Sequence, residues 1–225
     1  MNQTQRIDWR DGEVPVSALF DDPFFSLEDG LAEARHVFLA GNGLPDRFQP
    51  GFHVAELGFG TGLNLAATWA AWRRAGMDGP LRFTSFEAFP MGPDEARRAL
   101  AAHPGLAFAA PVIAEALEIA KGETARIAVE DLVLTVVVGD ARATLPAWDG
   151  RADAWFLDGF SPAKNPELWE PDLLAAVAAH TAPGGSCATY TAAGAVRRAL
   201  AGAGFTVDRV AGYGRKRHMS VGRMP

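Results

Sequence analysis

The residues from Phe52 to Gly62 constrain the fold more than any other stretch of the chain. They read FHVAELGFGTG, a short apolar run that ends in a carboxylate and is followed by a glycine at every second position. The next residues, Leu63 to Trp72, have the composition of a helix. Glycine is needed where a turn adopts positive φ or where the backbone approaches a ligand closely. The stretch therefore predicts a strand, a tight turn and a helix N-terminus, an arrangement that presents backbone N–H groups to a nucleotide-like ligand.

The spacing of Gly58, Gly60 and Gly62 narrows the class of ligand. The dinucleotide fingerprint G-x-G-x-x-G would place its last glycine where this chain has Leu63. The Gly-Lys-Ser/Thr of a phosphate-binding loop does not follow either. With Glu56 directly ahead, the loop fits a cationic ligand without phosphate groups. We therefore expect S-adenosyl-L-methionine, whose amine favours a carboxylate.

Composition limits the classes of protein further. The 225 residues suffice for one large domain, and no apolar run approaches the roughly 18 residues of a membrane span. The polar N-terminus lacks the apolar core of a secretion signal, and Cys187 has no second cysteine to pair with, so we expect a cytoplasmic location and no membrane contact. The net charge of −6 excludes a global basic field for nucleic acid. RNA would have to bind through a local patch such as Arg215, Lys216 and Arg217.

Strand-like and helix-like segments alternate after residue 50. The expected strands are 52–57, 82–87, 132–138, 153–158, 184–190, 205–211 and 217–222. The expected helices are 28–39, 62–75, 93–102, 167–180 and 193–203. This alternation predicts a doubly wound α/β fold with a mainly parallel, seven-stranded sheet and an antiparallel hairpin at one edge. We expect residues 1–50 to form an N-terminal extension that packs on the main domain, 51–225; segment 104–131 gives no clear signal.

A carboxylate stands at the end of each of the first four expected strands: Glu56, Glu87, Asp140 and Asp158. Ligands of open α/β sheets bind at these strand ends. Glu56 would either accept from the amine of the ligand or fix the glycine loop. Glu87 would accept from both ribose hydroxyls, unless it is a solvated loop charge. Asp140 would accept from the adenine amino group while the Ala141 N–H donates to the ring, and it could also cap the next helix.

Asp158 opens a second distinctive stretch, residues 158–169, with the sequence DGFSPAKNPELW. Prolines, a glycine and polar residues directly after an apolar strand predict an ordered loop beside the ligand. A carboxylate here would face the methyl group and take a proton from an acceptor amine. Lys164 and Asn165 would contact substrate or stabilise the loop. Phe160 is a candidate for base stacking, as are Phe24 and Phe25.

Several motifs together resemble one family, the methyltransferase half of the bifunctional tRNA 5-methylaminomethyl-2-thiouridine biosynthesis proteins. The motifs are ELGFGTGLN at 56–64, SFE at 85–87, DGFSPAKNP at 158–166 and GRKR at 214–217, with DGLAEAR at 29–35 and FLAGNGL at 38–44. The resemblance runs from about residue 9 to the end of the chain. The DGFSPAKNP stretch is far more specific than the glycine loop.

The resemblance implies a Rossmann-like class I methyltransferase that uses S-adenosyl-L-methionine to methylate 5-aminomethyl-2-thiouridine at the wobble position of tRNA. It also implies an FAD-dependent oxidoreductase, as a further domain or a separate protein, that acts upstream. The expected cofactor-binding residues are Glu56, Gly58, Gly60, Thr61, Gly62, Asn64, Glu87, Asp140 and Ala141. Asp158 is the expected catalytic residue, and the expected substrate-binding residues are Phe160, Lys164, Asn165, Arg215, Lys216 and Arg217.

Alternatives remain. His218 stands where the family pattern has an acidic residue, which puts the exact nucleoside in doubt. The acidic net charge also allows an N-methyltransferase of a small-molecule amine, and a noncatalytic module that binds tRNA or an oxidoreductase is a third interpretation. No histidine has metal-ligand spacing, and we expect no metal. We expect Cys187 to be a small core residue.

Overall fold

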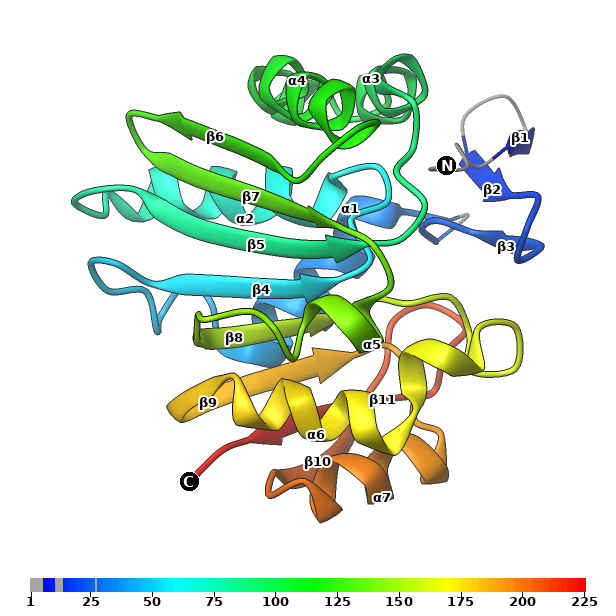
Figure 1. The fold of residues 1–225 in the computed structure, drawn as a ribbon, viewed down its shortest axis with the longest axis vertical. Coiled ribbons are helices and arrows are strands. Elements are labelled where there is room, and N and C mark those ends of the chain that lie inside the picture. The colour runs from blue at the N-terminus through cyan, green and yellow to red at the C-terminus, as the bar shows by residue number, and fades with distance from the viewer. Residues whose placement is uncertain (1–5, 11–13, 27) are drawn as a thin grey trace.

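A mixed sheet of eight strands forms the centre of the molecule, with helices on both faces (Figure 1). The computed structural model describes residues 6–10, 14–26 and 28–225. The strand order in the central sheet is β10-β11-β9-β8-β4-β5-β7-β6. The pairs β4–β5, β4–β8, β5–β7 and β8–β9 are parallel. The predicted doubly wound α/β class is therefore confirmed.

The strands of the central sheet have these bounds: β4 (His53–Leu57), β5 (Leu81–Glu87), β6 (Ala125–Val129), β7 (Leu132–Val138), β8 (Ala152–Leu157), β9 (Thr181–Thr189), β10 (Thr206–Ala211) and β11 (His218–Arg223). A separate antiparallel sheet consists of β1 (Ile7–Arg10), β2 (Val14–Ser17) and β3 (Asp22–Pro23). The α-helices are α1 (Gly30–Ala34), α2 (Leu63–Ala75), α3 (Pro93–Ala101), α4 (Ala110–Ala120), α5 (Ala141–Thr144), α6 (Pro171–Ala179) and α7 (Gly194–Gly202). Short helical turns of other types are η1 (Arg35–Leu39), η2 (Ala40–Asn42), η3 (Pro104–Ala109) and η4 (Pro166–Trp169).

The carboxyl ends of the parallel strands meet at one edge of the sheet, on the right of Figure 1. The small N-terminal sheet lies at this same edge, and α5 begins there (Figure 1). In open α/β sheets this edge is where ligands bind. The fold therefore brings the loops that follow β4, β5, β7 and β8 together beside residues 14–26.

Strand β4 is buried on both faces, which explains its nearly continuous apolar sequence. Val54 contributes to the core on the side of α2, together with Phe83 and Phe156. Leu57 contributes to the core on the opposite face, together with Trp155. Two large apolar clusters thus clamp the central strands and hold their carboxyl ends in fixed positions.

The segment that gave no clear sequence signal, 104–131, contains η3, α4 and β6. Strand β6 pairs antiparallel with β7 and adds an eighth strand to the predicted seven. The predicted antiparallel edge hairpin is also present, since β11 pairs antiparallel with β10 and with β9. None of the helices in the described part of the chain combines the length and hydropathy of a membrane-spanning segment.

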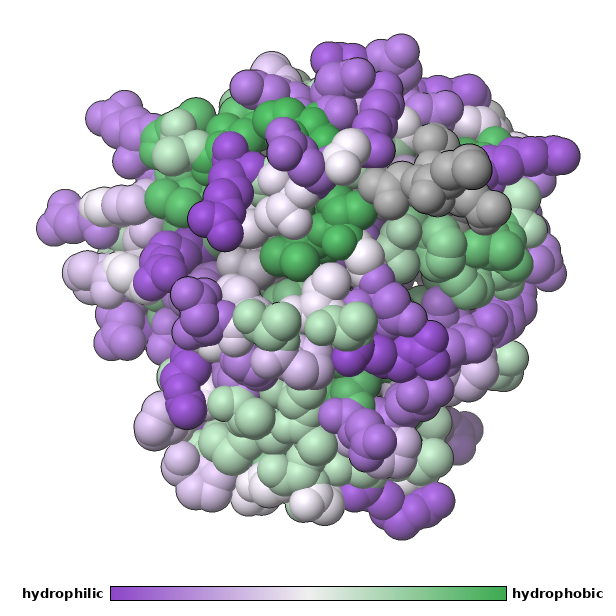
Figure 2. Space-filling model, viewed as in Figure 1, coloured by the Kyte–Doolittle hydropathy of each residue, from purple (hydrophilic) through white to green (hydrophobic). Residues whose placement is uncertain are grey.

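Residues 19–26 form a segment, which we name the N-terminal strap, that crosses the carboxyl edge of the central sheet. It includes β3, and its first residue, Leu19, is 59% exposed. Figure 2 shows apolar surface in this region, near β3 at the right of the view. In the same view, small and mildly apolar side chains cover the lower part of the molecule over α6. The strap is the part of the N-terminal region that reaches the candidate site.

Candidate active site

The glycine loop between β4 and α2 is the tight turn that its sequence predicts, but the N–H groups of its three glycines donate to acceptors within the protein and are not presented to a ligand. Gly58, Gly60 and Gly62 all have positive φ, at +89°, +52° and +76°. A Cβ atom on Gly58 would lie 2.5 Å from the backbone oxygen of Asp158. Only glycine therefore allows the loop to pass so close to the end of β8. Gly62 is the N-cap of α2 and lies behind the loop, where a Cβ would meet Ile113.

Glu87, at the end of β5, holds the glycine loop in place. Its Oε2 atom accepts hydrogen bonds from the N–H groups of Phe59 and Gly60, at 2.9 and 3.1 Å. Its Oε1 atom accepts from the N–H of Phe89 at 2.8 Å. These three contacts fix a carboxylate at the tip of the strand. Oε2 already accepts two hydrogen bonds, whereas Oε1 accepts one and retains a lone pair for a ligand hydroxyl.

Glu56 lies behind the loop and is 1% exposed. Its two carboxyl oxygens accept from Asn64 Nδ2 at 3.0 Å and from Ser85 Oγ at 2.7 Å. Burial is the largest effect on this group and raises the pKa of Glu56 well above its usual value. Because both oxygens have protein donors, the geometry favours its second predicted role, fixing the loop, over contact with a ligand amine.

Asp158 follows β8 and shares a donor with Glu56. The Nδ2 group of Asn64 donates to Asp158 Oδ2 at 2.7 Å. Burial raises the pKa of Asp158 to about 7; the Asn64 hydrogen bond and Lys216 lower it, whereas Glu33 raises it. The carboxyl is thus held in one orientation and can change its protonation state near neutral pH.

The glycine loop and Asp158 line one cavity of about 220 Å³, which we name the glycine-loop cavity. Of the predicted site residues, it contains Gly58, Gly60, Thr61, Asn64, Glu87, Asp158, Phe160 and Lys216. Its other polar or aromatic walls include Asp22, Phe24, Phe25, Ser26, Glu33 and Tyr190. Carboxylates and aromatic rings therefore dominate this cavity.

A second cavity of about 400 Å³ lies beside the first, and we name it the Asp140 cavity. Of the predicted site residues, it is lined by Gly58, Glu87, Asp140, Ala141, Phe160, Lys164 and Asn165. Gly58, Phe24, Glu87 and Phe160 line both cavities. Phe160 stacks on Phe20 of the strap at 4.7 Å and meets Phe24 edge-on at 5.2 Å. One elongated ligand can therefore span both cavities past Glu87.

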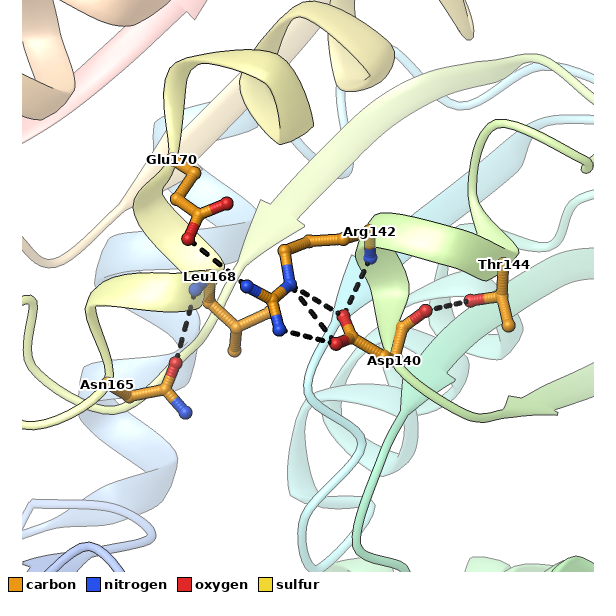
Figure 3. A network of polar contacts seen from close by, with 6 residues as sticks. All are labelled: Asp140, Arg142, Thr144, Asn165, Leu168 and Glu170. Atoms are coloured by element: carbon orange, nitrogen blue, oxygen red, sulfur yellow. Dashed lines mark hydrogen bonds and ion pairs between the residues drawn. The ribbon is translucent and has the colours of Figure 1, made fainter.

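Asp140 is the N-cap of α5 and forms an ion pair with Arg142 (Figure 3). Its Oδ1 atom accepts from the Arg142 N–H at 2.9 Å, and Arg142 Nη2 lies 2.7 Å from Asp140 Oδ2. Hydrogen bonding to Arg142 is the main reason why the pKa of Asp140 is lowered. Arg142 also reaches Glu170 at 3.1 Å. The predicted capping role is confirmed. The Ala141 N–H, at the first position of α5, has no acceptor within that helix.

Asn165 and Lys164 make contacts within the protein. Asn165 is 7% exposed, and its Oδ1 accepts from the Leu168 N–H at 3.2 Å, which caps η4 (Figure 3). Lys164 Nζ donates to the backbone oxygen of Asp21 and lies 3.6 Å from Asp22 Oδ1. Both contacts are of the loop-stabilising kind, one of the two predicted roles.

The three cationic side chains of the basic turn, residues 214–217, lie in different surroundings. Lys216 lines the glycine-loop cavity, whereas Arg215 and Arg217 line neither cavity. Arg215 pairs with Glu28 at 3.2 Å, and its side chain is 94% exposed. Arg217 has no ion pair with any residue of the described ranges. His218 begins β11 beside the turn and is partly buried.

Among the lining residues that the sequence analysis did not predict as site residues are Asp22, Glu33 and Tyr190. Tyr190 directly follows β9, so a strand-end rule that included aromatic residues would have found it. Its O–H donates to the backbone oxygen of Gly159 at 2.8 Å. Asp22 has no local signal, and Glu33 lies within the motif at 29–35, which by itself gave no reason to place this residue in the site. In the described parts of the chain, no cluster of three or more His, Cys, Asp or Glu side chains could hold a metal ion.

Comparisons with known proteins decide the family. A family model described as S-adenosyl-L-methionine-dependent methyltransferase matches residues 107–225, just over half of the chain. The chain belongs to this family. The expected cofactor and the class I methyltransferase fold are thereby confirmed. The matched part includes Asp140 and Asp158 but begins after the glycine loop.

Close relatives support the predicted resemblance. The chain is similar to the tRNA 5-methylaminomethyl-2-thiouridine biosynthesis bifunctional proteins MnmC of Caulobacter vibrioides, with 51% identity over 93% of this chain, and of Pseudomonas paraeruginosa, with 44% over 98%. It spans about a third of these relatives, 36% and 35% of their lengths. The crystal structure of MnmC2 from Aquifex aeolicus matches with a TM-score of 0.75 and 28% identity, covering 99% of this chain and 72% of that one.

Proposed function

We propose that the protein transfers a methyl group from S-adenosyl-L-methionine to the amine of 5-aminomethyl-2-thiouridine at the wobble position of tRNA, giving 5-methylaminomethyl-2-thiouridine. The observation that carries this proposal is the Asp158 carboxyl, held by Asn64 at 2.7 Å in the same cavity as the glycine loop. The names of the relatives support this choice of substrate.

The residues of both cavities fit S-adenosyl-L-methionine. The positive φ of Gly58 and Gly60 leaves the loop backbone bare, and a Cβ on Gly60 would lie 3.1 Å from Phe24 at the cavity wall. Glu87 lines both cavities, and its Oε1 atom retains a lone pair for a ribose hydroxyl. Asp140 and the Ala141 N–H would hold the adenine in the Asp140 cavity. When bound, this cofactor supplies an electrophilic methyl group on a sulfonium sulfur.

Asp158 would act as the proton acceptor. A primary amine has a pKa near that of lysine, about 10.4, and only its neutral form has the lone pair that attacks carbon. Formation of the new N–C bond leaves an extra proton on nitrogen, which an ionised Asp158 can take. Asn64 keeps the carboxyl aimed into the cavity. Positioning by these two residues would account for much of the rate, because the methyl group is already activated.

Aromatic walls would hold the base of the acceptor. Phe24 and Phe160 meet edge-on at 5.2 Å, and both line the glycine-loop cavity. Tyr190 forms a further wall of this cavity. Stacking on such rings is worth about 1–3 kcal/mol per base in single-stranded nucleic-acid sites. A flipped wobble base can therefore enter this cavity while its phosphates stay outside, near Arg217 and Arg215.

The test is a methyl-transfer assay with S-adenosyl-L-methionine and tRNA that carries 5-aminomethyl-2-thiouridine, followed by mass spectrometry of the nucleosides. We expect a gain of one methyl group at the wobble nucleoside and none on tRNA with unmodified uridine there. No product on the correctly modified tRNA would overturn the proposal. If free small amines were methylated as fast as intact tRNA, the result would instead favour the alternative, a small-molecule N-methyltransferase. The overall charge of −6 also permits this alternative.

Three wider predictions accompany this function. An FAD-dependent oxidoreductase, in the same polypeptide or separate, would supply the aminomethyl nucleoside; the bifunctional names of the relatives support this. The location would be the cytoplasm, where tRNA is modified, and cell fractionation would test it. The division into an extension, 1–50, and a methyltransferase domain, 51–225, also stays a prediction, which limited proteolysis would test.

A further inference from the structure

Lys216 is the cation that the basic turn places in the glycine-loop cavity. Its Nζ atom lies 2.9 Å from Glu33 Oε1 and 3.8 Å from the centre of the Tyr190 ring. The Lys216 side chain is 44% exposed, and that of Glu33 is 11% exposed. The ammonium group is therefore fixed at the mouth of the cavity from two sides.

Glu33 is itself held in place by the N-terminal strap. Its Oε2 atom accepts from the Ser26 N–H at 3.0 Å, while its Oε1 atom accepts from Lys216. The residue lies on α1, whose N-cap is Asp29. Glu33 thus connects the strap with the basic turn, two segments that are almost 200 residues apart in the chain.

The charged residues that line this cavity differ in the hydrogen bonds they can form with an acceptor. Its acidic lining residues are Asp22, Glu33, Glu87 and Asp158, and Lys216 is the basic side chain among the described lining residues. Ionised carboxylates only accept hydrogen bonds, so they serve the amine of an acceptor but not its ring carbonyl. An ammonium group has three N–H donors, and Glu33 takes one.

We propose that Lys216 recognises the acceptor by donating a hydrogen bond to a ring carbonyl oxygen, and that Glu33 is the positioning residue that holds Lys216 for this contact. The inference rests on the proposed function and names the part of the acceptor that the cavity reads: a heterocycle with a carbonyl oxygen near its aminomethyl group. The four carboxylates would repel phosphate from this cavity. Lys216 therefore differs from its neighbours Arg215 and Arg217, which face outward.

The experiment compares Lys216→Met, Lys216→Arg and the wild-type protein. The acceptors are the free nucleoside 5-aminomethyl-2-thiouridine, which has no phosphate, and tRNA that carries it. We expect Lys216→Met to raise KM about tenfold or more for both acceptors, because a hydrogen bond to a charged group is lost. The Kd of S-adenosyl-L-methionine should stay within about twofold, since the contacts proposed for the cofactor involve the glycine loop, Glu87 and Asp140 but not Lys216. Lys216→Arg should restore most of the lost affinity.

Two further variants separate positioning from folding. Glu33→Gln should raise KM less than Lys216→Met, and the double variant should be no worse than Lys216→Met alone, because both act through one contact. Lys121→Met is the matched control: this lysine caps the C-terminus of α4, pairs with Glu118 at 2.7 Å and lines neither cavity, so the KM of this variant should equal that of the wild type.

The outcomes are distinguishable. Transfer by the wild-type protein with an unchanged KM in Lys216→Met overturns this inference and leaves the proposed function intact. A KM that rises only for tRNA, together with a weaker salt dependence, overturns it in favour of a phosphate contact. No transfer by the wild-type protein to either acceptor overturns the proposed function and the inference together.

Discussion

The side-chain amide of Asn64 lies 2.7 Å from Asp158 Oδ2 and connects this carboxyl with the buried Glu56, whose Oε1 accepts from the same nitrogen at 3.0 Å. Asn64 is the second residue of α2, and Glu56 belongs to β4. A single amide therefore couples the end of β8 to the strand and helix that flank the glycine loop. Burial raises the pKa of both carboxyls, and only Asp158 lines the glycine-loop cavity.

Replacing Asp158 with asparagine removes the proton acceptor and keeps the size of the side chain. We expect kcat to fall about 100- to 10,000-fold, the usual contribution of a general base. The Kd of S-adenosyl-L-methionine should change by less than about threefold, since the glycine loop and Asp140 remain. Single-turnover transfer and calorimetric binding measure the two effects. Equal losses in both would contradict the assigned role; Asp172→Asn, an exposed carboxylate of α6, is the control.

The pH dependence of transfer should reflect the same carboxyl. Burial raises the pKa of Asp158 to about 7, and only the ionised form accepts a proton. We expect kcat/KM to rise with pH up to about 8, with an inflection near 7. The inflection should vanish in Asp158→Asn, whereas the titration of the acceptor amine at higher pH should persist. An inflection that survives in the variant would assign it to another group.

As pH rises, the free energy of unfolding should change in the opposite direction to kcat/KM. The folded-state pKa of Asp158, about 7, exceeds the unfolded value of about 3.9, so between these limits the folded state binds more protons. The free energy of unfolding therefore falls as pH rises from 4 to 7. Asp158→Asn should be more stable than the wild type at pH 8, by about 1–2 kcal/mol given partial solvent access, and similar at pH 4. Urea unfolding at both pH values measures the difference.

The sequence predicted the central part of this site because its signals are local. The glycines of the loop, the strand ends and the capping carboxylate Asp140 each depend on neighbouring residues. Strand β6 was missed because it is a largely exposed edge strand with little apolar alternation. Helix α4 was missed because Pro104, in η3, and Pro111, in the first turn of α4, interrupt the pattern of this segment. The link between Glu33 and Lys216 could not be predicted, since it depends on tertiary packing alone.

Gly60→Val tests the glycine loop as a cofactor site. The valine would add a branched side chain at φ +52°, with its Cβ 3.1 Å from Phe24, and would fill the cavity wall. We expect binding of S-adenosyl-L-methionine to weaken at least about 100-fold. Gly76→Val is the matched control, because Gly76 has φ +64° at the end of α2 and open space around it. It imposes similar backbone strain, so a similar loss of binding in Gly76→Val would refute the steric argument.

Lys164→Met distinguishes a strap contact from a substrate contact. Lys164 reaches Asp22 at 3.6 Å, and Asp22 Oδ2 accepts from the Ser161 N–H at 3.0 Å, so the two contacts fasten the strap to the loop after β8. A partly exposed ion pair is worth about 0–1 kcal/mol, which limits the expected rise in acceptor KM to about fivefold. Limited proteolysis within residues 19–26 should become faster, because the strap opens more often.

Phe160→Ala is the variant with which the effect of Lys164→Met on the strap is compared. Phe160 stacks on Phe20 at 4.7 Å and meets Phe24 at 5.2 Å, so its loss removes both the packing that seats the strap and a wall of each cavity. We expect the affinities for both cofactor and acceptor to fall about tenfold or more, which is a larger effect than that of Lys164→Met. A rise of more than tenfold in acceptor KM for Lys164→Met, with unchanged proteolysis, would instead indicate that Lys164 touches the acceptor directly.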